Sequence, residues 1–267
     1  MAKVAENTEL VPQPPAQSPQ STQSDIIPSD LLGLAAEHAG EGVSTNAEHN
    51  VVPLVRRLQK MSDQLDENHG DFIAGARPGD IWLRDVSVLI KGSDGIVFQP
   101  CFFRVEYPEW RPRGGGGGSA PVHRWSEMPE DAVEKVDDSG RRHFLMPGGN
   151  EIIPTHYFTG FVMNMPGSMP ALPVVIPMKA TDIAIARSWM TRMNLKPLLA
   201  DGKLPPSYLY LYRLTTKPRS NAEGTWHTWA VDDYGAVQSR DQFQRGSSLF
   251  HAMASQERVE EAATGEM

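Results

Sequence analysis

The segments "DIWLRDVSVLI" (80–90) and "GIVFQPCFFRVEY" (95–107) constrain the fold most, because both are rich in β-branched and aromatic residues. That composition favours strands, and the short polar loop "KGSDG" between them contains glycine. We therefore expect the two segments to pair as a β-hairpin. Further strands are predicted at "NEIIPTHYFTGFVMN" (150–164) and "ALPVVIPM" (171–178), whose prolines place them at sheet edges or strand ends.

One helix and a second hairpin complete the predicted body. The helix is "TDIAIARSWMTRMNLK" (181–196), with Thr181 or Asp182 as N-cap and a proline at its end. Its predicted apolar stripe consists of Ile183, Ala186, Met190 and Met193. "PPSYLYLYRLTT" (205–216) and "GTWHTWAVDD" (224–233) form the second predicted hairpin. This order predicts a mainly β (α+β) domain with one packed helix, compatible with a small barrel or a sandwich.

The composition changes at both ends of the chain and once in the middle. Residues 1–50 form a Pro-, Gln- and Ser-rich extension that we expect to be disordered, apart from a short helix over 30–39. The folded body is expected over 51–235, with a flexible glycine-rich and acidic loop at 114–140. Residues 236–267 are expected to be a disordered acidic C-terminal tail.

The acidic charge lies mostly outside the expected body. The formal net charge of the chain is −8. Residues 1–50 carry one lysine against seven acids, and residues 126–138 carry six acids against one lysine. Outside these segments and the acidic C-terminal residues, the remaining chain is mildly basic, so the overall charge does not exclude a nucleic-acid partner. Acidic tails that only keep a protein soluble are the alternative interpretation.

A search for catalytic and metal-binding patterns finds none that is complete. The glycine run "GGGGGS" (114–119) is not a phosphate-binding loop, because no lysine followed by Ser or Thr comes after it. The eight histidines show no metal-ligand spacing, and Cys101 lies on a predicted core face. We therefore expect no enzymatic activity, no cofactor and no metal. A nuclease whose carboxylates are distant in sequence remains an alternative.

Aromatic and basic side chains occur together on the predicted strands. In 95–107 the expected core face is Val97, Cys101, Phe103 and Val105, and the opposite face is Phe98, Phe102, Arg104 and Glu106. In the second hairpin, Tyr208, Tyr210 and Tyr212 share one strand face. Aromatic side chains that stack on bases, beside cations that contact phosphates, are typical of single-stranded nucleic-acid binding. Ordinary packing of these aromatics in the core is the alternative.

The segments "VPLVRRLQKMSDQLDENHGDFIAGARPGDIW", "PCFFRVEYPEWRPR", "PPSYLYLYRLTT" and "GTWHTWAV" resemble a family of tailed-bacteriophage single-stranded DNA-binding proteins. The resemblance covers about residues 51–232. It implies an OB-like fold, DNA binding without catalysis, and a role in phage DNA replication or recombination. The long N-terminal extension and the acidic segment 126–138 depart from the family pattern.

The predicted function is therefore binding of single-stranded DNA in the cytoplasm of the host cell. The acidic tail is expected to recruit replication or recombination proteins, no membrane contact is expected, and a homo-oligomer is compatible with the sequence. The predicted DNA-binding residues are Phe102, Arg104, Trp110, Arg111, Arg113, Tyr210, Tyr212, Arg213, Lys217 and Arg219. The alternative is a virion or assembly protein that uses its aromatic β face for protein–protein contacts.

Overall fold

The computed structural model describes residues 31–38, 52–112, 120–137, 142–167, 169–222 and 224–265. The chain divides into two units, Met1–Asn50 and Val51–Met267. In the first unit, helix α1 (Leu31–Glu37) agrees with the helix predicted over 30–39. The disorder predicted for the rest of residues 1–50 lies outside the described residues.

The second unit is mainly β, as predicted. Its strands are β1 (Val55–Arg57), β2 (Ile81–Leu83), β3 (Val88–Ile90), β4 (Ile96–Trp110), β5 (His123–Trp125), β6 (Val133–Val136), β7 (Arg142–Leu145), β8 (Glu151–Ile152), β9 (Thr155–Val162), β10 (Leu172–Lys179), β11 (Tyr210–Asn221) and β12 (Gly224–Ala236). Its helices are α2 (Asp182–Asn194), α3 (Arg240–Gly265) and three short 3-10 helices, η1 (Asp63–Leu65), η2 (Arg84–Val86) and η3 (Ser207–Leu209).

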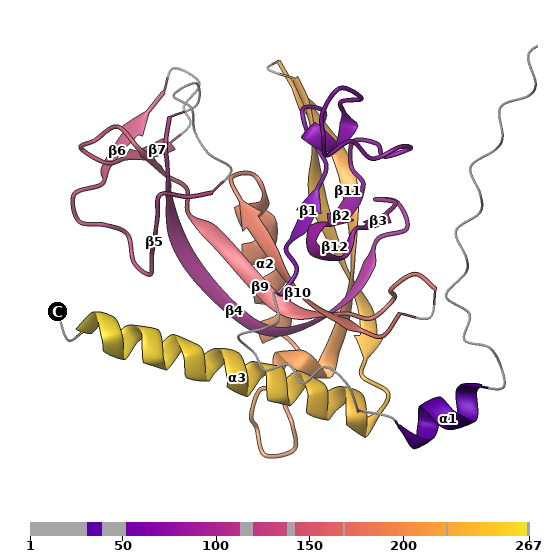
Figure 1. The fold of residues 1–267 in the computed structure, drawn as a ribbon. Coiled ribbons are helices and arrows are strands. Elements are labelled where there is room, and N and C mark those ends of the chain that lie inside the picture. Colours follow the sequence, from indigo (N-terminus) through magenta and orange to yellow (C-terminus); the bar gives the residue numbers. More distant parts are fainter. Residues whose placement is uncertain are drawn as a thin grey trace, which may run out of the picture. The chain divides into compact units, whose positions relative to one another are not determined.

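Strand β4 is the strand on which the larger sheet is built (Figure 1). It pairs antiparallel with β11 at its beginning, with β9 along its middle, and with β5 and β8 at its end. The order β10-β9-β4-β8-β7-β6 describes one path through this sheet, and β1-β2-β3 form a separate small sheet. Among the described strands both sheets are open, so the pairing does not confirm a closed OB-like barrel.

A β-bulge in β4 overturns the predicted assignment of its faces. The pairing with β9 runs from Pro100 opposite Gly160 to Phe102 opposite Thr159, which leaves Cys101 as an extra residue. An extra residue reverses the alternation of side chains between the two faces. Consequently Phe98 and Phe103 both point into the main core, although the sequence alternation separates them.

The first predicted hairpin, 80–90 with 95–107, does not form. Segment 80–90 itself folds back, because η2 separates β2 from β3 and these two short strands pair with each other. Ser87 after η2 has φ 52°, a left-handed conformation that redirects the chain. Strand β4 then joins β9 and β11 rather than β3. The second predicted hairpin does form, as the long β11–β12 pair.

Prolines protect the edge of the sheet at β10, as the sequence predicted. β10 pairs with β9 on one side, and on the other side the Val175 N–H donates to the Pro53 carbonyl at 2.9 Å. Pro173 and Pro177 share the orientation of Val175 and have no N–H to offer to an additional strand. The edge is therefore closed to strand addition at these positions.

Helix α2 covers the core face of the sheet through Trp189, which the predicted stripe did not include. Trp189 is fully buried, with ring centroids 4.4 Å from Phe158, 5.3 Å from Tyr212 and 6.1 Å from Phe98. Ala186 is buried beside it, whereas Met190 and Met193 pack at the margin. The helix begins at Asp182 after Thr181, in agreement with the prediction.

Helix α3 replaces the disordered tail predicted over 236–267. It packs along the opposite face of the sheet, under β4 in Figure 1, where the Gln99 side chain donates to the Tyr208 carbonyl at 2.7 Å. Phe243 and Phe250 contact Tyr208, and Phe250 contacts Phe102. These apolar side chains recur at helical spacing, which explains why the segment orders despite its acidic end. In the described part of the chain, no helix has the length and apolar character needed to span a membrane.

The predicted flexible loop over 114–140 is only partly irregular. Strand β5 pairs with the end of β4, and β6 pairs with β7. His143 on β7 contacts the carboxylates of Asp137 at 2.9 Å and Glu151 at 2.8 Å, which ties β7 to its neighbours. The glycine run itself lies outside the described residues.

A buried ion pair joins β1, α2 and β12. Arg57 Nη2 donates to Asp182 Oδ2 at 2.8 Å, and the two side chains are only 11% and 6% exposed. The other oxygen, Asp182 Oδ1, accepts the Trp229 N–H at 3.3 Å, and the Arg57 guanidinium lies 5.4 Å from the Trp229 ring centroid. One carboxylate thus holds three elements together.

We expect Asp182→Asn to lower the free energy of unfolding by roughly 3–5 kcal/mol, because it leaves the Arg57 charge buried without a counter-ion. Urea denaturation measures the change. The matched control is Asp201→Asn, which breaks the solvent-exposed pair with Lys203 and should leave the urea midpoint unchanged. Equal midpoints for the two variants would contradict a structural role for the buried pair.

We expect Gly246→Ala to loosen α3 from the sheet. A Cβ at this position would lie 2.8 Å from Gln99 Nε2 and 2.9 Å from Tyr208 Cβ, so the helix has to move outward. Alanine alone would favour the helix by about 1 kcal/mol, so faster amide hydrogen exchange in α3 would report lost packing. Ser248→Ala, on an exposed position of α3, is the control. Slower exchange in both variants would contradict the close packing.

Candidate nucleic-acid interface

The hairpin of β11 and β12, which we call the β11–β12 arm, has two chemically different faces. Residues directly opposite each other in its register share a face. One face, which includes Leu214, Val231 and Trp229, is buried in the core. The other face, which we call the outer face, carries Arg213, Thr215, Lys217 and Arg219 from β11 and Trp226, Thr228, Ala230 and Asp232 from β12.

The outer face brings together three of the predicted phosphate contacts. Arg213, Lys217 and Arg219 are exposed, and Arg219 lies directly opposite the half-buried Trp226. The Arg213 guanidinium donates to the Asp94 carbonyl at 2.8 Å, which fixes one end of the row. Among the described residues of this face, Asp232 is the single acid. A row of cations beside an indole can hold a phosphate backbone and stack on a base.

The free edge of β12 is held by side chains rather than by another strand. The Gln59 amide donates to the His227 carbonyl at 3.1 Å and accepts the His227 N–H at 2.9 Å. Arg192 Nη2 donates to the Val231 carbonyl at 2.7 Å. Burial and the nearby Arg57 charge lower the pKa of His227, so its neutral form is favoured. These contacts fix the arm along one edge and leave the cations Arg213, Lys217 and Arg219 of the outer face exposed, whereas Thr228 on that face is buried.

Tyr212 and Phe102 cannot stack on bases, contrary to the prediction. Tyr212 is fully buried against Trp189, and burial raises the pKa of its phenol. Phe102 is buried under α3 beside Phe250. The predicted row of three tyrosines is also absent in these residues, because Tyr208 lies in η3 and packs against α3.

Arg104 and Tyr210 are engaged by neighbouring charged side chains. Arg104 Nη2 contacts Glu106 Oε1 at 2.6 Å, and Glu106 also binds Arg124 at 2.8 Å. Tyr210 is half-buried, with the Lys196 ammonium 4.9 Å from its ring centroid. Neither residue lies on the outer face of the arm, so the structure separates both from the basic row.

Trp110 and Arg111 lie at the far end of β4. From Val97, which pairs with Arg213, to Trp110 is about 40 Å of strand. The Lys179 ammonium lies 5.1 Å from the Trp110 ring centroid, so one face of the indole is already covered. Arg111 is exposed. Arg113 lies outside the described residues.

The described residues offer little support for metal or thiol chemistry. Asp63, His69 and Asp71 form one group whose ligand atoms lie within 4.8 Å of one another, but all three are exposed. His69 Nδ1 already accepts the Asp71 N–H at 3.2 Å. Burial raises the pKa of the Cys101 thiol to about 12, which disfavours the reactive thiolate.

The sequence predicts Arg213, Lys217 and Arg219 as DNA contacts but was not used to place them on one strand face, although the signal was present. Arg213, Lys217 and Arg219 occupy odd positions of one strand, and period-two alternation places odd positions on one face. Lys179 could not be found in this way, because its contact with Trp110 depends on the pairing of β10, β9 and β4.

We expect Tyr212→Phe to leave the free energy of unfolding unchanged or to raise it by up to about 1–3 kcal/mol. The buried Tyr212 hydroxyl has no hydrogen-bond partner among the described residues. Removing it therefore removes the free-energy cost of burying a hydroxyl without a hydrogen bond. Chemical denaturation measures the effect, and Tyr210→Phe, which removes a hydroxyl from a half-buried ring, is the control. A clear loss of stability for Tyr212→Phe alone would contradict the unpartnered hydroxyl.

Comparisons with known proteins give one match. No curated protein and no solved structure matches the chain. A family model, described as the Pam3 phage gp34-like protein, matches residues 23–259 and so covers most of the chain, including the β11–β12 arm and the first part of α3. The chain therefore belongs to the Pam3 phage gp34-like family of bacteriophage proteins.

Proposed function

We propose that this bacteriophage protein binds single-stranded DNA through the outer face of the β11–β12 arm, without catalysing a reaction. The observation that carries the proposal is the exposed row of Arg213, Lys217 and Arg219 beside Trp226, on a hairpin whose other face is fixed in the core. Such a protein would act in phage DNA replication or recombination.

The chemistry of this face favours single strands over duplexes. Trp226 can stack only on a base that is not already stacked in a helix, and such bases are available in single strands. Lys217 and Arg219 are alternate residues and lie about 7 Å apart along the strand. They would contact successive parts of one phosphate backbone. The proposal does not depend on a mobile acidic tail, because the segment from Arg240 onward forms α3.

A second candidate is a virion or assembly protein that acts through protein–protein contacts. The observation that favours it is the group of exposed leucines in the loop after α2, at 195–204. Contiguous exposed apolar side chains are typical of protein–protein interfaces. This surface is separate from the basic row, so the two functions can be tested independently.

We expect the double variant Lys217→Ala/Arg219→Ala to bind labelled oligo-dT at least tenfold more weakly than the unmodified chain at low salt. The measurement is fluorescence anisotropy over a salt series. For single strands, log K falls with log[salt] by about 0.7 per neutralised phosphate, so losing two cations should flatten the slope by roughly 1.4. Trp226→Ala should weaken binding through the loss of stacking, by about 1–3 kcal/mol.

The control is Arg111→Ala, which removes an exposed cation at the far end of β4 and should leave affinity and salt slope unchanged. A duplex of the same length should bind more weakly than oligo-dT. The proposal is wrong if the unmodified chain binds neither probe at low salt, or if Arg111→Ala loses as much affinity as the arm variants.

A further inference from the structure

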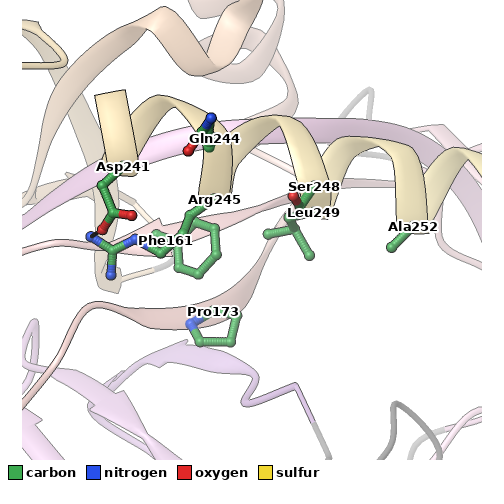
Figure 2. Close-up of a pocket in the computed structure, with 8 residues that line it drawn as sticks. All are labelled: Phe161, Pro173, Asp241, Gln244, Arg245, Ser248, Leu249 and Ala252. Atoms are coloured by element: carbon green, nitrogen blue, oxygen red, sulfur yellow. Dashed lines mark ion pairs between the residues drawn. The ribbon is translucent and has the colours of Figure 1, made fainter. Parts of the chain in front are cut away.

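The groove beside α3 offers a partner no net charge. It has a volume of about 440 Å³, and Figure 2 shows Leu249 of the helix above Phe161 and Pro173, which are paired residues of β9 and β10. Its two charged lining residues, Asp241 and Arg245, contact each other at 3.7 Å and neutralise each other. A group with a more defined chemistry lies at the opposite end of the sheet, where β8, β7 and β6 follow one another.

The hairpin of β6 and β7, which we call the β6–β7 hairpin, is weakly attached to the rest of the sheet. All four residues of β6 are exposed, and among the described strands β6 pairs with β7 alone. β7 pairs with β8 at two positions, Phe144 opposite Ile152 and Leu145 opposite Glu151. A segment with so little buried surface opens at a low cost in free energy, so a single added contact has a large influence on it.

The His143 imidazole supplies such a contact through both of its ring nitrogens. Nδ1 lies 2.8 Å from Glu151 Oε1 on β8, and Nε2 lies 2.9 Å from Asp137 Oδ2, directly after β6. A neutral imidazole has one N–H and one bare nitrogen, whereas the imidazolium has two N–H groups. Because ionised carboxylates only accept, both contacts are hydrogen bonds only when the ring is protonated.

Across the hairpin, one exposed cation faces the imidazole. Lys135 is directly opposite His143 in the register and shares its face. Arg142 and Glu134 have the other parity, and Arg142 Nε contacts Glu134 Oε1 at 3.3 Å on the opposite face. Residues 138–141, which connect the two strands, lie outside the described residues.

On the β8 side, the described cation lies beyond the next strand. Glu151 is opposite Trp110 of β4, and the Lys179 ammonium lies 5.1 Å from the Trp110 ring centroid. Two carboxylates therefore bond the imidazole directly, whereas the described cations face it from an exposed position or from a further strand. This balance of charge favours the imidazolium, because hydrogen bonds between ionised groups are stronger than neutral ones.

We propose that His143 is a pH-sensitive clasp that holds the β6–β7 hairpin against β8 when it is protonated and releases the hairpin when it is neutral. The neutral ring keeps one N–H, so one of the two hydrogen bonds is lost and a bare nitrogen then faces a carboxylate. The closed hairpin binds the proton, so its added stability is fully present below about pH 6.5, where an ordinary histidine is protonated, and is lost as the pH rises. The inference goes beyond DNA binding and does not require it.

Hydrogen–deuterium exchange of the full chain measures the opening directly. Amides of residues 133–145 should lose protection when the buffer is changed from about pH 5.5 to about pH 8.5, two values on either side of the ordinary histidine ionisation and above that of carboxylates. After correction for the intrinsic exchange rate, the protection factor should fall roughly tenfold or more, the effect of one hydrogen bond to a charged group. Residues 172–194, which contain no histidine, are the internal reference. Equal protection of the hairpin at the two pH values would overturn the proposal.

His143→Gln separates the clasp from other effects of pH. The glutamine amide does not change its protonation in this range, so the hairpin should show the low protection at both pH values. The matched control is His123→Gln, which replaces an exposed histidine on β5 and should keep the full pH dependence. A His143→Gln chain that retains the tenfold change would contradict the assignment of the clasp to this ring.

A second readout needs no variant. Long-range ¹H–¹⁵N spectra of the imidazole rings report which nitrogens carry protons. At about pH 7, above the ionisation of an ordinary histidine, His143 should still be protonated on both nitrogens. Its titration midpoint should lie above that of His123. A neutral His143 ring at this pH, or a midpoint at or below that of His123, would show that the carboxylates do not hold the proton and would refute the clasp.

Discussion

The fold depends on strand β4, which is buried on both faces for most of its length. Its first half faces α2 and the core through Phe98, while Gln99 and Phe102 face α3 on the other side. The bulge at Cys101 makes this possible, and it requires Gly160 opposite: a Cβ on Gly160 would lie 2.0 Å from the Gln99 carbonyl oxygen. The absence of a side chain at Gly160 on β9 therefore permits α2 and α3 to pack on the two faces of β4.

The free edge of β12 is the second constraint. Unpaired edge strands invite association with other strands, and this edge is satisfied by side chains instead. The Gln59 amide bonds both the N–H and the carbonyl of His227, as a neighbouring strand would. Asp182 accepts the Trp229 N–H, and Arg192 donates to the Val231 carbonyl. These residues come from the segment after β1 and from α2, so the orientation of the arm is set by the same contacts that close the core.

Local signals in the sequence were sufficient for some elements. The helix predicted over 181–196, the hairpin predicted over 205–233 and the proline-protected edge predicted over 171–178 follow from residues that are neighbours in sequence. The face assignment of 95–107 failed because the bulge is decided by pairing with β9. The helix α3 could have been predicted, since Phe243, Phe250 and Met253 have helical spacing, but the acidic residues that follow dominated the composition of the segment.

The candidate site was predictable in part for the same reason. Residues whose role depends on alternation within one strand, Arg213, Lys217 and Arg219, fall together on the outer face. Tyr212 has the opposite parity, which alone separates it from the basic row and directs it into the core. An aromatic and a basic residue that are adjacent in sequence on a strand therefore point to opposite faces. Two such residues can contact one ligand only when they are two positions apart on the strand or opposite each other across the hairpin.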